Sequence, residues 1–175
     1  MKVVIIMGGK SSRMGQDKGF VSYQGKSLFE RVISLVSQID EEYYLSVSLE
    51  QFEFLGHKYR CIIDSIPDKG PLAGIFSAMA YLKEDILVVP IDMPNLTIEV
   101  LKPIIETGRT AAYQVNQWIQ TLPSYWSFKD HDIIQKALYT DQLQLKSFFE
   151  KNGNLIPFYG NEKVFLNVNR PEDIG

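Results

Sequence analysis

Three cationic side chains lie close together near the start of the chain, in a glycine-rich stretch that directly follows an apolar run. Gly8 and Gly9 allow the backbone to turn sharply and to present its N–H groups to an anion. Lys10, Arg13 and Lys18 follow, and a polyphosphate bound between them would relieve their mutual repulsion. The residues therefore predict a phosphate-binding loop, and the alternative is a solvated basic turn.

Two common phosphate-binding motifs are excluded. The Gly-Lys-Ser triplet at 25–27 has Phe20 where a Walker A motif requires a glycine. Residues 8–15 do not keep the G-x-G-x-x-G spacing of dinucleotide-binding dehydrogenases. The loop is therefore of another kind.

Two aspartates, Asp64 and Asp92, each follow a predicted strand. Because both strands are predicted to end at one rim of a sheet, both carboxylates can lie there. Mg²⁺ binds through one or two carboxylates together with phosphate oxygens of the substrate, so this rim is a candidate metal site. The alternative is that each aspartate only caps the next turn.

The elements that must position these residues alternate over the first half of the chain. Residues 2–7 read as a strand buried on both faces, and Ser27 with Glu30 forms the sequence pattern of a capping box that starts a helix running to Ile39. Strands are predicted at 43–48, 60–63 and 86–90, and helices at 74–82 and from Asn95 or Thr97 through Glu106. This alternation predicts parallel βαβ units, whose ligand site lies beyond the carboxyl ends of the strands.

The second half predicts an antiparallel addition. Residues 110–115 and 118–125 read as a hairpin around Asn116 and Gln117. Helices are predicted from Asp130 through Leu138 and over 143–152, followed by strands at 155–158 and 164–166. The predicted fold is α/β: a Rossmann-like three-layer sandwich with a mostly parallel sheet, helices on both faces and a small antiparallel addition, forming one domain over residues 1–175.

Composition excludes several classes of protein. The net charge of −3 gives no general positive field, so neither nucleic acid nor a membrane is an expected partner. Cys61 is the only cysteine, which rules out an internal disulfide and a cysteine-rich metal site. No apolar run is long enough to span a membrane, and the expected location is the cytoplasm.

The motifs, taken together, resemble one family. The stretch with Gly8, Gly9, Arg13, Met14 and Gly15, followed by Asp-Lys-Gly at 17–19 and Gly-Lys-Ser-Leu at 25–28, is similar to the signature of molybdenum cofactor guanylyltransferases. The segments 70–75 and 167–173 resemble two further motifs of that family. The resemblance implies transfer of GMP from GTP to the phosphate of molybdopterin or Mo-molybdopterin with Mg²⁺ as cofactor, and it leaves other molybdenum-cofactor proteins as possible partners.

The resemblance also implies roles for single residues. Arg13 and Lys18 would be catalytic through their charge on the phosphates, Asp92 would bind the metal, and Asn167 and Asn169 would hold the pterin substrate. The expected nucleotide contacts are Ile6, Met7, Gly8, Gly9, Lys18, Asp64 and Asp92. The chain departs from the family at Met7, where alanine is usual, and at 46–48, where an asparagine-bearing stretch is often found.

Two other functions remain open: another nucleotidylyltransferase, of the molybdopterin cytidylyltransferase or sugar-nucleotide type, and a non-catalytic nucleotide-binding domain of the same fold.

Trp118, Tyr125 and Trp126 can each stack on a planar pterin or belong to the core. His57 and His131 have neither metal-ligand spacing nor a nucleophile partner, and both are expected at the surface.

Overall fold

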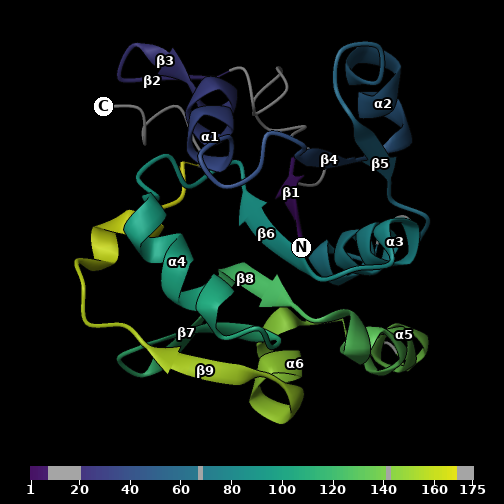
Figure 1. Ribbon diagram of the computed structural model, residues 1–175, viewed down its shortest axis with the longest axis vertical. Helices are drawn as coiled ribbons and strands as arrows, with labels where there is room; N and C mark the ends of the chain where they lie inside the picture. Colours follow the sequence, from purple (N-terminus) through teal and green to yellow (C-terminus); the bar gives the residue numbers. More distant parts are fainter. Residues whose placement is uncertain (8–20, 67–68, 141–142, 169–175) are drawn as a thin grey trace.

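The computed structural model, which describes residues 1–7, 21–66, 69–140 and 143–168, is built around a seven-stranded sheet of order β5-β4-β1-β6-β8-β7-β9 (Figure 1). The strands are β1 (Lys2–Ile6), β4 (Tyr44–Val47), β5 (Cys61–Ile63), β6 (Ile86–Pro90), β7 (Ala111–Val115), β8 (Trp118–Trp126) and β9 (Asn154–Pro157). A separate two-stranded antiparallel sheet joins β2 (Ser22–Tyr23) and β3 (Lys26–Ser27).

The first four strands of the order are parallel. β1 pairs with β4 on one side and with β6 on the other, and β5 pairs with β4. β8 runs antiparallel to both β6 and β7, so β7 and β9 point the same way as β1. The predicted α/β fold with its antiparallel addition is confirmed.

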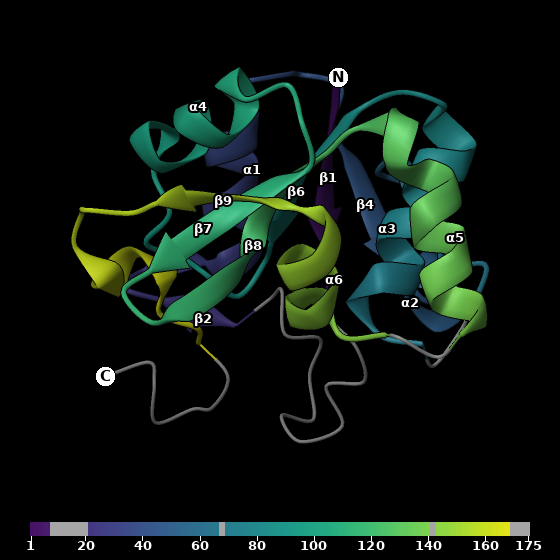
Figure 2. The ribbon, with the colours of Figure 1, turned by 90° about the horizontal axis from the view of Figure 1, so that it is seen from below.

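Helices cover both faces of the sheet: α1 (Leu28–Val36), α2 (Leu49–Leu55), α3 (Pro71–Leu82), α4 (Ile98–Glu106), α5 (His131–Tyr139) and α6 (Leu145–Asn152). Two buried clusters divide the core. One contains residues of α1 and α4, and the other contains residues of α3, α5 and α6. Figure 2 shows α1 and α4 on one side and α3 and α5 on the other. β1 and β6 supply residues to both clusters, which explains their continuous apolar sequences.

Capping explains where several helices start. Ser27 Oγ accepts the Glu30 N–H at 3.1 Å, and Glu30 Oε2 accepts the Ser27 N–H at 2.8 Å, so the predicted capping box is present. The third helix starts at Pro71, earlier than the predicted 74, because Gly70 takes a φ of 70° and proline is favourable at the first helical position.

Two segments differ from the sequence-based expectations. Residues 164–166 do not form a strand: the 3-10 helix η3 (Glu162–Phe165) stands there, started by the Asn161 side chain, which accepts the Lys163 N–H at 3.0 Å. The helix α2 was not expected, although Ser48 and Gln51 form a second capping box. Within the described residues, no helix is long and apolar enough to cross a membrane.

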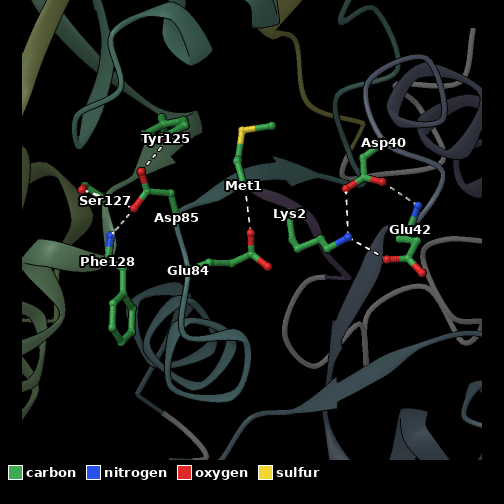
Figure 3. Close-up of polar contacts among 9 residues, drawn as sticks. All are labelled: Met1, Lys2, Asp40, Glu42, Glu84, Asp85, Tyr125, Ser127 and Phe128. Carbon is green, nitrogen blue, oxygen red and sulfur yellow. Dashed lines mark hydrogen bonds and ion pairs between the residues drawn. The ribbon is translucent and has the colours of Figure 1, made fainter.

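A polar network closes the amino edge of the sheet (Figure 3). Asp85, just before β6, accepts the Tyr125 hydroxyl at 2.6 Å and the Phe128 N–H at 2.7 Å. Burial acts to raise the pKa of Asp85, but the hydrogen bonds from Tyr125, Phe128 and Ser127 outweigh it and hold the pKa below its usual range. These bonds fasten the start of β6 to the end of β8 and leave the opposite edge for the ligand.

Candidate functional site at the carboxyl edge of the sheet

The parallel strands β1, β4, β5 and β6 all end at one edge, on the side where β2 lies in Figure 2. Ile6 ends β1 in register with Ser46 and Pro90, so the end of β1 lies between β4 and β6. The Ile6 carbonyl accepts the Ile91 N–H at 3.1 Å, and the Met7 N–H donates to the Ser46 carbonyl at 3.3 Å. The predicted loop residues Gly8, Gly9, Arg13 and Lys18 lie outside the described residues.

Asp64 stands directly after β5, and its N–H donates to the Val47 carbonyl at 3.0 Å. Its Oδ1 accepts the Ile66 N–H at 2.9 Å and the Ser77 hydroxyl at 3.2 Å. Burial raises the pKa of Asp64, and these two hydrogen bonds partly oppose the shift. The carboxylate is therefore half-buried and held in one orientation by the helix α3.

The helix α3 lies unusually close to β4. A Cβ added at Gly74 would meet the Ser46 Oγ at 2.8 Å. The glycine thus permits an approach that no other residue allows without a shift. The N-terminal turn of α3, at Pro71, lies at the carboxyl edge of the sheet, where the N–H groups of this turn favour negative charge.

Asp92 follows β6 in the adjacent loop and is half-buried. Its backbone carbonyl accepts the N–H of Val168 at 2.8 Å. This bond places Asn167, whose side chain is exposed, beside Asp92, although the two are far apart in sequence. Asn95 adds a second link, donating to the Lys163 carbonyl at 3.4 Å, whereas Asn169 lies outside the described residues.

The strand order separates the two aspartates. Asp64 follows β5 and Asp92 follows β6, with β4 and β1 between these strands. Three inter-strand spacings of about 4.8 Å put their backbones about 14 Å apart. Ligands of Mg²⁺ lie at about 2.1 Å, so the two carboxylates do not share one ion. Among the described residues, no group of three or more His, Cys, Asp and Glu side chains forms a metal cluster.

Two cavities border the described residues. The larger, of about 360 Å³, lies at the amino edge among Tyr43, His57 and Arg60, away from both aspartates. The smaller, of about 260 Å³, lies between α3 and α5 and is lined by Ile66 and Phe76, close to Asp64. We assign the site by the convergence of polar groups at the carboxyl edge, because the larger cavity is open and far from that edge.

The aromatic and histidine side chains divide into two groups. Tyr125 and Trp126 are buried core residues, whereas Trp118 is 44% exposed. His57 is exposed as expected. The expectation for His131 is wrong: its ring stacks on Phe76 with centroids 4.7 Å apart, and its Nε2 is buried without a hydrogen-bond partner among the described residues.

Sequence reasoning missed Ser77, which orients Asp64. No local pattern marks it, because the partners are joined only by the packing of α3 beside β5. It also missed the importance of Val168, which acts through its backbone N–H and therefore leaves no signal in the identity of its side chain.

Known proteins share this architecture. Residues 3–154 match the MobA-like NTP transferase domain. The chain is 30% identical over 152 residues to a probable molybdenum cofactor guanylyltransferase of Flavobacterium johnsoniae, covering 84% of this chain and 79% of the relative. A protein of the same description from Clostridium perfringens is 32% identical over 97% of this chain and 91% of its own length.

A solved structure has the same fold as this chain. Molybdopterin-guanine dinucleotide biosynthesis protein A from Archaeoglobus fulgidus superposes with a TM-score of 0.82 at 25% identity, covering 99% of this chain and 95% of that one. The chain therefore belongs to the MobA-like NTP transferase family and is a nucleotidyltransferase.

Proposed function

We propose that this enzyme transfers GMP from GTP to the terminal phosphate of molybdopterin, or of Mo-molybdopterin, and releases pyrophosphate. An acceptor phosphate oxygen forms a bond to the α-phosphorus, and the bond from that phosphorus to the bridging oxygen breaks. Pyrophosphate leaves with the electron pair, and no covalent intermediate with the protein is required. The names of the relatives support the choice of guanine and of the acceptor. We place the reaction in the cytoplasm.

The observation that carries the proposal is the hydrogen bond from the Val168 N–H to the Asp92 carbonyl. We assign Asp92, which follows β6, to the nucleotide side of the site and Asn167 to the acceptor side. A reaction between two phosphorylated substrates requires such convergence, because phosphoryl-type transfer depends mainly on positioning and on stabilisation of charge.

The donor chemistry at Asp92 fits Mg²⁺. A half-buried carboxylate at the open edge of the sheet supplies one hard oxygen ligand, and the substrate phosphates and water complete such sites. The ion, when bound, would neutralise charge on the triphosphate. The backbone of Asp64 lies about 14 Å from that of Asp92. Its carboxylate, which accepts the Ser77 hydroxyl, would instead position the nucleoside end of the substrate. Arg13 and Lys18 would balance the phosphate charge from the loop.

The nucleotide preference is tested with the intact protein, molybdopterin and Mg²⁺, offering GTP, CTP, UTP and ATP in turn. Pyrophosphate release and the mass of the dinucleotide product are measured. We expect turnover with GTP to exceed that with the others. A preference for CTP would reassign the enzyme as a cytidylyltransferase, and no pyrophosphate with any nucleotide would support a non-catalytic domain.

Two substitutions test the assigned residues. Asp92→Asn and Lys18→Ala should each lower kcat by about 100-fold or more, since each removes charge from the transition state. The matched controls are Asp132→Asn, which changes an exposed aspartate of α5, and His57→Ala. Both should leave kcat unchanged. Wild-type turnover by the Lys18→Ala protein would exclude its catalytic role.

A further inference from the structure

Trp118 is a large aromatic residue exposed at the edge of the sheet that carries the site. It is the first residue of β8 and is 44% exposed, whereas Trp126 at the other end of the same strand is 0% exposed. β7 runs in the direction of β6, so the β7-β8 turn lies at the edge where β6 ends and Asp92 follows. The core does not account for this side chain.

The register of the hairpin tells on which face Trp118 lies. Trp118 pairs with Val115, and Gln120 pairs with Tyr113, so these four side chains share one face of the sheet. Val115 and Tyr113 belong to the buried cluster that includes α1, α4 and Met93. The Gln120 Nε2 lies 4.0 Å from the Met93 Sδ. Trp118 therefore lies on the face of the Asp92 loop, one step nearer the edge than Gln120.

The β8 strand is divided, and its first residues extend past the end of β6. Ser124–Trp126 pairs with β6, whereas the first residues of β8 pair with β7 after a shift in register. Because β6 ends at Pro90, the segment beside the end of the β7-β8 hairpin is the Asp92–Asn95 loop and not a strand.

The hairpin end is also held in place. The Gln114 Nε2 donates to the Asn116 carbonyl at 2.8 Å and to the Trp118 carbonyl at 3.2 Å. The Asn116 side chain donates to Glu162 of η3, and η3 leads directly to Asn167 and Val168. One continuous set of contacts therefore links the Trp118 backbone to the segment that bonds to Asp92.

We propose that the indole of Trp118 is the stacking surface for the planar pterin ring of the acceptor substrate. An aromatic face that is exposed, that stands on a hairpin held in place and that lies on the face of the Asp92 loop suits a planar heterocycle. The inference rests on the proposed function and assigns Trp118 to the acceptor, leaving the nucleotide to Asp64 and the loop after β1.

The kinetic test compares Trp118→Ala, Trp118→Phe and the control Tyr159→Ala, in which another highly exposed aromatic side chain is removed. Loss of one stacked ring should raise the KM for molybdopterin about tenfold, while the KM for the nucleotide stays within about twofold. Phenylalanine should restore most of the affinity, since a smaller ring still stacks. An unchanged molybdopterin KM in Trp118→Ala, or an equal rise for both substrates, would overturn the assignment.

The two tryptophans provide a direct binding readout. Iodide quenches exposed Trp118 and not buried Trp126, so molybdopterin bound over the indole should lower the iodide-quenching constant of the wild-type protein, whereas the nucleotide alone should not. The Trp118→Phe protein should show little quenching with or without molybdopterin. Undiminished quenching at saturating molybdopterin would contradict the proposal.

Failure of this inference and failure of the proposed function give different results. If the wild-type protein forms a dinucleotide but Trp118→Ala leaves the molybdopterin KM unchanged, the function holds and the stacking role is wrong. If molybdopterin neither shields Trp118 nor supports pyrophosphate release with any nucleotide, the proposed acceptor itself is wrong.

Discussion

The close approach of α3 to β4 makes Gly74→Ala an informative substitution. In an exposed helix interior, alanine in place of glycine stabilises by up to about 1 kcal/mol. Here the new Cβ would lie 2.8 Å from the Ser46 Oγ, well inside an ordinary contact. Overpacking costs about 1–3 kcal/mol, and because the conflict is with the hydroxyl of a serine, which can rotate, we expect the lower end of this range and no net gain in the free energy of unfolding.

Replacing Ser46 by alanine removes the conflict. The nearest remaining atom to the new Cβ is then the Cβ of residue 46, at 4.0 Å, an ordinary van der Waals distance. In the Ser46→Ala background, Gly74→Ala should therefore stabilise, and the coupling between the two substitutions should be about 1 kcal/mol. Ala80→Gly, at an exposed position of the same helix, reports helix propensity alone and should not depend on residue 46.

Urea unfolding followed by the fluorescence of buried Trp126 measures all four proteins of the cycle. Because α3 also carries Ser77, the Gly74→Ala protein should bind the nucleotide more weakly, with an increased KM. Equal stabilisation by Gly74→Ala in both backgrounds would refute the close packing of α3 on Ser46.

Three further predictions concern hydrogen bonds. Ser27→Ala removes the cap of α1 and should lower the free energy of unfolding by about 1 kcal/mol in urea titrations; no loss would exclude the capping box. Because the pKa of Asp64 is raised, the wild-type protein should lose stability as pH rises from about 3.8 through that pKa, and Asp64→Asn should remove this loss in unfolding curves recorded across the range while weakening nucleotide binding. The pKa of Asp85 is lowered, so its contribution is present above about pH 3.8 and is lost as pH falls through the folded-state pKa. Tyr125→Phe should cost about 1–2 kcal/mol at neutral pH and leave the nucleotide KM unchanged, and a shift in that KM would mean that the amino edge influences the site.

Local patterns predicted most of the elements. The continuous apolar run of β1 and β6, the Ser27–Glu30 capping pair and the turn at Asn116 are each signalled within a few residues, and the structure confirms all three. The signal for α2 was equally local and was missed. The strand expected at 164–166 is wrong because a short run of apolar side chains that includes Phe165 is also buried by a single 3-10 turn.

The arrangement of the site could not be predicted from the sequence without knowledge of the fold. Parallel strands implied that Asp64 and Asp92 lie at one edge, but their separation depends on the strand order, which places β4 and β1 between them. Sequence distance likewise gave no warning that Val168 bonds to the Asp92 loop, since the bond uses backbone atoms alone. Residue type did not distinguish the three candidate aromatic residues, whereas their burial shows that only Trp118 among them is exposed.

The backbone bond between Val168 and Asp92 also sets an order of events during translation. Ribosomal synthesis delivers β1, β4, β5 and β6 first, and N-terminal structure forms before later segments emerge. On the proposed assignment, the residues given to the nucleotide are therefore synthesised before Asn167. The proposed acceptor side can form only after the chain beyond η3 has left the exit tunnel, so the two sides of the site are completed at different times.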